Sequence, residues 1–319
     1  MKLADFPLTT KGLCGMMKPK DFSGREAYAV TLTPQGFDPR QEMGKPDYEL
    51  QYKRDSYLKD VELHHHDFYE LYFLLSGDVT YIIESRVYHV LPGDLLLISP
   101  RELHQVCIRP EMSAYERYVL WVAPQTLSEL STPDTDLARS LDPARPGYGN
   151  LLRLSPEDRE KIQSMMEQLY RESQSAGFGG ELLRRSLLVQ FLVTINRLVE
   201  REKPEQPPRS NQAVSKVIDY INLHYGEPLS LDMLAERFYV SKYHLSHEFN
   251  RQVGTSLYRY IQKKRLMFAR QLLAGGERPN QVYAACGFGD YAGFYRAFRA
   301  EYGVSPREYV QSVRGWREG

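Results

Sequence analysis

The chain has 319 residues, 42% of them hydrophobic and 26% charged, and its 41 basic residues balance its 41 acidic ones. That length allows two domains with separate cores, and the composition is that of an ordinary globular protein. Cys14, Cys107 and Cys286 form an odd set without a C-x-x-C pair, which argues against a disulfide scaffold. The N-terminus lacks the apolar core of a signal peptide, and no stretch approaches the roughly 20 apolar residues of a membrane span. We therefore expect a cytoplasmic protein with no membrane partner.

Charge is unevenly distributed along the chain. Residues 209–319 hold 16 Lys and Arg against 10 Asp and Glu, which leaves 25 against 31 for residues 1–208. The net charges of the two parts are thus +6 and −6. A basic C-terminal third beside an acidic remainder suits a DNA-binding domain attached to a sensor domain. A solvated basic surface would give the same excess, so charge alone does not decide.

Short strand-like runs dominate the first 125 residues or so. Turn residues such as Gly77 and Gly93 separate them, which is typical of a β-barrel or sandwich. The runs are Tyr28–Thr33, Tyr48–Tyr52, Tyr69–Leu75, Val79–Glu84, Leu95–Ile98 and Tyr115–Val122. Residues 131–150 contain three prolines and two glycines, and we expect a loop there.

Two helices are predicted next. Ser155 is a suitable N-cap, Pro156 fits the first helical position, and two acidic residues follow in the first turn. The second helix, over residues 182–198, has an apolar stripe wide enough for two packing surfaces. One of those surfaces belongs either to the intramolecular core or to a dimer interface. The polar segment Glu202–Ser210, with three prolines, predicts a linker.

The remaining residues predict helices only, and they contain a helix-turn-helix pattern. Ser230 and Ser241 are placed to cap two successive helices. In the second of these helices only Leu245 and Phe249 have the spacing of buried positions. A short helix, a tight turn and a helix with few buried positions are typical of this motif.

The same plan occurs a second time. A long basic amphipathic helix over about residues 256–273 leads to another short helix, whose turn is Cys286-Gly287-Phe288. Phe294 and Phe298 are the expected buried positions of the helix that follows. The chain therefore predicts two helix-turn-helix units.

The second unit resembles the signature of the AraC/XylS family of transcription regulators. Its matching positions are Ala284 or Ala285, Gly287, Phe288, Phe294, Arg296, Phe298, Gly303, Ser305, Pro306 and Tyr309. The first unit matches at Leu234, Ala235, Ser241, Leu245, Phe249, Gly254, Tyr260, Arg265, Ala269, Leu272 and Leu273. The resemblance covers about 100 residues in the same order. It implies that two recognition helices enter successive major grooves and that the long helix joins them.

The exposed side chains of the two recognition helices are the predicted DNA contacts. Hydrogen-bond donors and flat rings there suit base edges and phosphates. The predicted contacts are Lys242, Tyr243, His244, Ser246, His247 and Arg251 in the first unit, and Tyr291, Tyr295, Arg296 and Arg299 in the second. Because Ala292 and Gly293 lack polar side chains, we expect the first unit to carry more direct readout.

A histidine cluster precedes one of the strand-like runs. His64 and His66 face the same side of an extended chain, and Glu70 follows at an even spacing. The pattern H-x-H-x-x-x-E resembles the first motif of cupin barrels. Pro92-Gly93-Asp94 followed by His104 resembles the second motif, which here lacks its usual Asn. The resemblance implies a cupin-like sensor before the DNA-binding domain.

The cupin resemblance implies two possible uses for these side chains. In metal cupins the positions of His64, His66, Glu70 and His104 bind a divalent metal, and the ligand types suit Zn, Mn, Fe or Ni. In AraC-type sensors similar residues line a pocket for a small organic effector, commonly a sugar. We predict the second use, with no cofactor and with metal as the alternative. The predicted effector-binding residues are His64, His66, Glu70, Tyr81, His104 and Trp121, of which the two aromatic ones would stack on a sugar.

The sequence thus predicts an α+β chain with a cupin-like β-barrel, an appended helical pair and an all-α double helix-turn-helix domain. The expected boundaries are 1–152 for the effector-binding domain, 153–202 for a dimerisation or connector segment, 203–211 for a linker and 212–319 for the DNA-binding domain. The predicted function is a non-enzymatic, homodimeric transcription regulator, an activator by resemblance. Its partners would be operator DNA, a sugar effector and RNA polymerase. Two alternatives remain: a metal-dependent cupin enzyme fused to a DNA-binding domain, and a barrel that only dimerises.

Overall fold

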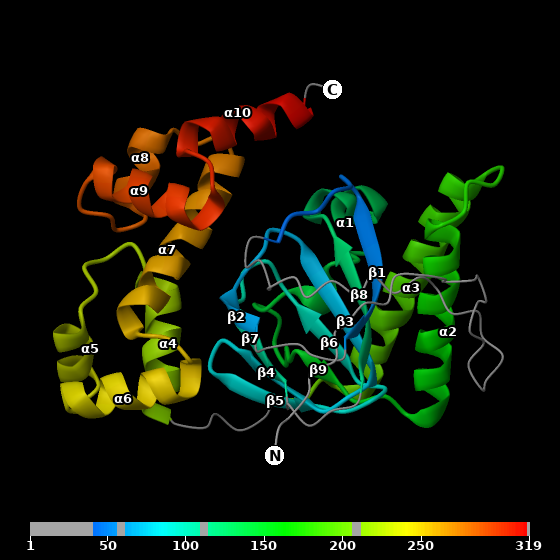
Figure 1. Cartoon of the computed structure of the whole chain (residues 1–319), viewed down its shortest axis with the longest axis horizontal. Helices are drawn as coiled ribbons and strands as arrows, with labels where there is room; N and C mark the ends of the chain where they lie inside the picture. The colour runs from blue at the N-terminus through cyan, green and yellow to red at the C-terminus, as the bar shows by residue number, and fades with distance from the viewer. Residues whose placement is uncertain (1–40, 56–60, 109–113, 206–211, 318–319) are drawn as a thin grey trace, which may run out of the picture. The chain divides into compact units, whose positions relative to one another are not determined.

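The computed structural model describes residues 41–55, 61–108, 114–205 and 212–317. Two antiparallel sheets come first along the chain, and helices alone form the C-terminal part (Figure 1). The strands are β1 (Tyr48–Asp55), β2 (Val61–His64), β3 (Tyr69–Ser76), β4 (Val79–Ile83), β5 (Arg86–Val90), β6 (Leu95–Ile98), β7 (His104–Ile108), β8 (Tyr115–Val122) and β9 (Leu151–Leu152).

The two sheets enclose an apolar cluster and, beside it, a cavity with a partly polar lining. Their strand orders are β1-β8-β3-β6-β9 and β2-β7-β4-β5. Because side chains alternate between the two faces of a strand, Tyr72 of β3 joins Tyr81 of β4 in the interior cluster. Leu71 and Phe73 face the opposite side and belong to a second cluster. β3, the middle strand of the five-stranded sheet, thus buries large side chains on both faces.

The helices α2 (Pro156–Ser173) and α3 (Gly180–Glu202) pack on the outer face of that sheet (Figure 1). The start of α2 is as the sequence predicts, since the Ser155 side chain accepts a hydrogen bond from the backbone N–H of Asp158. Between β8 and α2 the chain forms the short helix α1 (Pro124–Leu130), the 3₁₀ turn η1 (Arg139–Leu141) and otherwise mostly loop.

The wide apolar stripe of α3 is largely intramolecular core. Leu188, Phe191 and Ile195 are at most 1% exposed and belong to the cluster that includes the outer face of the sheet. Leu182, in the first turn of α3, is 73% exposed, and Leu183 is 43% exposed. Only the beginning of the helix thus leaves an uncovered apolar surface.

The C-terminal helices form the two predicted helix-turn-helix units. The first unit is α5 with α6, the second is α8 with α9, and α7 lies between them in the sequence. Their bounds, with the flanking helices, are α4 (Gln212–His224), α5 (Leu231–Arg237), α6 (Lys242–Val253), α7 (Leu257–Ala274), α8 (Pro279–Ala285), α9 (Tyr291–Tyr302) and α10 (Pro306–Arg317).

Each recognition helix begins at a capping side chain and buries a narrow stripe. Ser241 accepts from the backbone N–H of His244 at the start of α6, and Asp290 accepts from Gly293 at the start of α9. Phe249, Phe294 and Phe298 are completely buried. These phenylalanines are packing residues, as the sequence predicts, and they leave the rest of each helix surface exposed.

The two turns share one backbone conformation. Gly287, the second residue after α8, has φ of +76°, and a Cβ there would lie 2.9 Å from the carbonyl oxygens of Gly226 and Tyr225. Tyr239 occupies the corresponding position after α5 with φ of +55°. The second unit thus requires glycine for both conformation and space, whereas the first accommodates a 96% exposed tyrosine.

The structure confirms the predicted fold class, with a sheet-rich N-terminal part and a helical C-terminal part. Five strands coincide with predicted runs, whereas β2, β5, β7 and β9 have no counterpart in the prediction. The run Tyr28–Thr33 and Cys14 lie outside the described residues. Within the described ranges, no helix combines the length and the hydropathy needed to span a bilayer. The proposed domain boundaries stay predictions.

Candidate DNA-binding helices and barrel cavity

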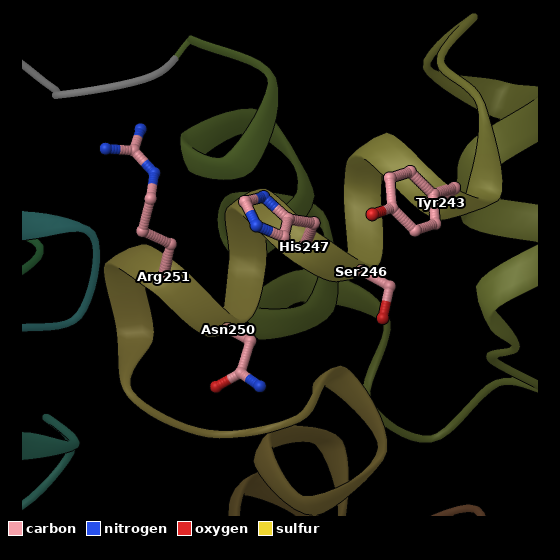
Figure 2. Close-up of a pocket in the computed structure, with 5 residues that line it drawn as sticks. All are labelled: Tyr243, Ser246, His247, Asn250 and Arg251. Atoms are coloured by element: carbon pink, nitrogen blue, oxygen red, sulfur yellow. The ribbon is translucent and has the colours of Figure 1, made fainter.

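The outward face of α6 carries side chains predicted to reach DNA. Tyr243, Ser246, His247 and Arg251 follow one another at spacings of three, one and four residues, so they share one side of the helix (Figure 2). All four are exposed, Tyr243 by 83%, and they line a surface hollow. An exposed face of rings and hydrogen-bonding groups on a short helix suits a major groove.

Asn250 belongs to this face, although the sequence prediction omits it. It lies four residues after Ser246 and seven after Tyr243, is exposed, and lines the same hollow (Figure 2). An Asn amide can pair bidentately with adenine. Helical spacing alone could have predicted Asn250, because position 250 lies on the same side of the helix as Tyr243 and Ser246.

Two predicted contacts of the first unit are held by acidic neighbours. Arg251 donates to both carboxylate oxygens of Glu248, at 3.2 and 2.6 Å. Lys242 pairs with Asp232 of α5. Exposed pairs of this kind contribute about 0–1 kcal/mol, so a phosphate oxygen can take the place of the carboxylate. His244, the remaining predicted residue, is also exposed.

The corresponding face of α9 has fewer donors. Arg296 and Arg299 are exposed, Tyr295 is partly buried, and Tyr291 is 38% exposed with its ring edge-on to Tyr283 at 5.9 Å. The two arginines are therefore the charged donors that α9 presents. Their placement agrees with the expectation that the second unit carries less direct readout.

A cavity inside the barrel brings together five of the six predicted effector-binding residues. It has a volume of about 80 Å³, and it is lined by His64, Glu70, Tyr81, His104 and Trp121 among others. The sixth residue, His66, lies next to this group, since its ring centroid is 4.9 Å from that of His104. The strands thus assemble these side chains from positions up to 57 residues apart in the sequence.

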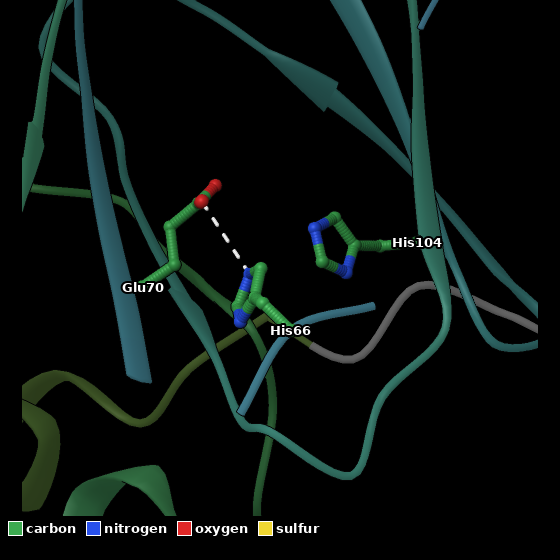
Figure 3. A group of neighbouring side chains, drawn as sticks. All are labelled: His66, Glu70 and His104. Carbon is green, nitrogen blue, oxygen red and sulfur yellow. Dashed lines mark ion pairs between the residues drawn. The ribbon is translucent and has the colours of Figure 1, made fainter. Parts of the chain in front are cut away.

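Three of these side chains form a compact buried cluster. One ligand atom each of His66, Glu70 and His104 lies within 4.8 Å of the other two (Figure 3). Nε2 of His66 is 3.5 Å from Oε2 of Glu70. The ring of His64 lies beside the cluster, with its centroid 4.2 Å from that of His104.

Backbone carbonyls fix the orientation of all three imidazoles. Nδ1 of His64 lies 2.9 Å from the carbonyl oxygen of Glu62, Nδ1 of His66 lies 2.7 Å from that of Phe68, and Nδ1 of His104 lies 3.1 Å from that of Glu102. A carbonyl oxygen can only accept, so each Nδ1 carries a proton, and Nε2 presents a lone pair wherever the ring is neutral. Nε2 of His66 and Nε2 of His104 are buried without a hydrogen-bond partner among the described residues.

The charges of the cluster follow from burial. Burial lowers the pKa of His104 to about 4 and the pKa of His64 well below its ordinary value, so both rings are neutral at pH 7. Burial alone would raise the pKa of Glu70, but an interaction with the Nε2–H of a protonated His66 would outweigh it and lower the pKa. Nε1 of Trp121 also donates to Glu70, at 2.9 Å. The carboxylate of Glu70 therefore lies in one cluster with the neutral imidazoles of His64 and His104.

The cavity also contains polar side chains that the sequence prediction misses. Lys53, Tyr72, Tyr115 and Arg117 all line it. The available signal is the alternation within Tyr48–Asp55, where every second residue is polar. A strand with one apolar and one polar face is read as half exposed, and only the sheet order shows that the polar face looks into the barrel.

Two family models match the chain: an AraC-like ligand binding domain at residues 49–192 and a helix-turn-helix domain at residues 234–312. The HTH-type transcriptional activator RhaS of Escherichia coli O139:H28 (strain E24377A / ETEC) is 23% identical over 258 residues, which are 81% of this chain and 90% of that protein. Among solved structures, fatty-acid-bound ToxT from Vibrio cholerae strain SCE256 is 12% identical, with 85% of this chain and 97% of that one covered and a TM-score of 0.38. The DNA-binding domain of AdpA in complex with a target DNA is 24% identical over 34% of this chain and 98% of that one, with a TM-score of 0.33. With an AraC-like ligand-binding domain followed by a helix-turn-helix domain, the chain belongs to the AraC family of DNA-binding transcription regulators.

Proposed function

We propose that a small polyhydroxyl molecule, in the first instance a sugar, binds in the barrel cavity and alters how the two helix-turn-helix units engage an operator. The observation that carries the proposal is the cavity itself, in which Tyr81 and Trp121 supply flat rings beside the polar Glu70 and His104. A ligand of this kind acts only through different affinities for two arrangements of the protein.

Two further observations support an activating role and a homodimer. The relative RhaS is named a transcriptional activator, which supports activation, RNA polymerase as a partner and a role without catalysis. Leu182 and Leu183 are 73% and 43% exposed on α3, which supports a homodimer that covers them. Light scattering during gel filtration measures this, and Leu182→Glu should shift the mass from dimer to monomer.

The test of the proposed function is DNA binding with and without ligand. Purified full chain is titrated onto DNA from its own upstream region by fluorescence anisotropy, at several salt concentrations and with a panel of neutral sugars. We expect specific binding that at least one sugar strengthens or weakens several-fold. Specific binding that no small molecule alters would refute effector control, and the absence of specific binding at low salt would refute the choice of operator or the proposal itself.

The histidine cluster supports a second candidate, a metal-binding sensor. Nε2 of His66 lies 3.5 Å from the carboxylate of Glu70. Because Nδ1 of His66 already donates to a backbone carbonyl, either a second proton on the ring or a cation must lie between Nε2 and the carboxylate. Imidazoles whose Nδ1–H is fixed by a carbonyl oxygen have the orientation that metal ligands usually have. His66, Glu70 and His104, with His64 beside them, would hold the ion. A divalent cation bound there would supply a Lewis-acidic centre to a ligand in the cavity.

Metal content distinguishes the two candidates. The protein is dialysed against Zn²⁺ or Mn²⁺, then against buffer, and the metal is counted per chain by mass spectrometry. The sensor candidate predicts about one ion per chain, loss of the ion in His66→Ala and His104→Ala, and retention in His89→Ala, whose histidine is exposed on β5. Less than a tenth of an ion in the unaltered protein would eliminate the metal candidate.

A further inference from the structure

The inner face of β1 is polar along its whole length. The partners of Glu49, Gln51, Lys53 and Asp55 on β8 are Trp121, Val119, Arg117 and Tyr115, and all four partners line the cavity. Directly opposite residues of an antiparallel pair share one face, so these four β1 side chains belong to the interior side. The intervening Tyr48 and Leu50 pack in the cluster beneath α2 and α3. A barrel wall whose apolar face is turned outward is suited to holding a polar molecule.

Two cations lie opposite each other on this wall. The register pairs Lys53 with Arg117, and both side chains line the cavity. Like charges in directly opposite positions destabilise a sheet. Asp55 pairs with Arg117, but among the described residues no carboxylate forms an ion pair with Lys53. Burial and the neighbouring guanidinium lower the pKa of Lys53, and the more weakly acting carboxylates of Glu70, Asp55 and Glu49 only partly offset this. Nζ of Lys53 lies 5.4 Å from the centre of the Trp121 ring. An anion between the two cations would relieve this repulsion.

Tyrosine hydroxyls surround the same cations. The guanidinium carbon of Arg117 lies 3.9 Å from the centre of the Tyr115 ring. The hydroxyl of Tyr72 donates to that of Tyr115 at 2.8 Å, and Tyr81 lines the cavity beside them. Hydroxyl, ammonium and guanidinium groups together can donate to each oxygen of a carboxylate.

The side of the cavity that carries the histidines presents hydrogen-bond acceptors, whereas the side of Lys53 and Arg117 presents donors. Glu70 accepts from Nε1 of Trp121 at 2.9 Å. Nδ1 of His104 donates to the carbonyl oxygen of Glu102, which leaves Nε2 as an acceptor without a partner in the described part of the chain. Buried acceptors are satisfied by donors, and a hydroxyl group is a donor. The lining therefore requires an anionic group at one end of the ligand and hydroxyl groups at the other.

We infer that the effector is a short hydroxycarboxylate, such as a small sugar acid, with its carboxylate at Lys53 and Arg117 and its hydroxyls at Glu70 and His104. This inference rests on the proposed function and narrows its ligand class from neutral sugars to their acids. The cavity volume of about 80 Å³ is well below the roughly 300–1,000 Å³ of ordinary ligand pockets. We therefore expect a ligand much smaller than those that ordinary pockets hold.

Calorimetric titration of the EDTA-treated full chain tests the inference. The panel pairs each acid with a neutral polyol of the same length: glycerate with glycerol, threonate with threitol, and gluconate with sorbitol as a longer pair. We expect a short acid to bind at least ten times more tightly than its polyol. Lys53→Met should weaken that acid at least tenfold without changing the polyol, and Lys53→Arg should restore most of the affinity.

The matched control is Arg54→Met, which removes one positive charge from the same strand. Arg54 is exposed and pairs with Glu116 at 3.0 Å, so acid binding should not change. Polyols that bind as tightly as acids would overturn the inference. So would acids that bind Lys53→Met undiminished, acids that bind only after metal is added, or an absence of acid binding. If a neutral sugar alters DNA binding and no acid binds, the inference about the acid is wrong but the proposed function is retained. If no small molecule alters DNA binding, the proposed function and the inference about the acid are both wrong.

Discussion

Replacement of Gly287 by alanine tests whether the turn of the second helix-turn-helix unit has no room for a side chain. At φ of +76°, an L-residue costs about 1–2 kcal/mol. The added Cβ would also lie 2.9 Å from two backbone carbonyl oxygens and 2.9 Å from the Arg265 guanidinium, and overpacking of this kind costs about 1–3 kcal/mol. Gly287→Ala should therefore destabilise the second unit by about 2–5 kcal/mol.

Two other substitutions separate the backbone cost from the clash. Gly276 has φ of +100° with no atom within 4 Å of a built Cβ, so Gly276→Ala should show only the backbone cost of about 1–2 kcal/mol. Tyr239 already holds the corresponding position of the first unit in the left-handed region. Tyr239→Gly should leave stability unchanged or raise it by up to about 1 kcal/mol.

Hydrogen exchange read out by mass spectrometry is the appropriate assay, because it reports the opening of α8 and α9 separately from the rest of the chain. We expect faster exchange in those two helices in Gly287→Ala, together with loss of specific DNA binding. Equal effects of Gly287→Ala and Gly276→Ala would refute the argument, since the carbonyl oxygens of Gly226 and Tyr225 would then contribute nothing.

Three further predictions concern a cap, a DNA contact and a thiol. Ser241→Ala removes the acceptor of the His244 N–H, 3.1 Å away, and should destabilise α6 by about 1 kcal/mol, measured by hydrogen exchange in that helix. If Arg296 reads a base, Arg296→Ala should weaken operator binding by about 1–3 kcal/mol and relax sequence specificity at one position. If Arg296 contacts a phosphate, the substitution should instead lower the slope of log affinity against log salt concentration by about one. Arg54→Ala, a substitution on the barrel, should change neither the affinity nor the slope. Burial raises the pKa of Cys286 to about 12, so at pH 8 almost none of this thiol is ionised. Iodoacetamide should therefore alkylate Cys286 slowly in the native chain and rapidly in urea. Alkylation of Cys286 as fast as that of the partly exposed Cys107 would contradict this.

The helical part could be predicted from sequence because its signals are local. Ser155, Ser230 and Ser241 each cap the helix that the sequence assigns to them. The spacing of Phe294 and Phe298 fixes which side of α9 is buried. Each of these relations spans no more than one or two helical turns, so neighbouring residues suffice to reveal it.

The barrel was harder to predict because its pairings are not local. β2 and β9 contain four and two residues, too few to show a period. β7 pairs with both β2 and β4, and β1 pairs with β8 more than 60 residues later. The polar face of β1 looks into the cavity only because of that last pairing. For this reason Lys53 and Arg117 are absent from the predicted site.

The protonation pattern of the histidines narrows what can occupy the cavity. The sequence brings His64, His66, Glu70 and His104 into consideration, but their chemistry depends on which nitrogen carries the proton. The carbonyl oxygens of Glu62, Phe68 and Glu102 decide this, and each belongs to a residue two positions from the histidine that it orients.

With every Nδ1 donating to backbone, the cluster presents lone pairs and one carboxylate to the cavity. Such a lining is satisfied either by a cation or by hydroxyl donors. An aliphatic or aromatic effector without donors would leave Nε2 of His104 buried and unpaired, at a cost of about 1–3 kcal/mol. Metal counting and the paired acid and polyol titrations therefore cover the two kinds of occupant that the geometry admits. An apolar effector bound tightly in this cavity would show that the imidazole orientations, on which both proposals depend, do not persist in solution.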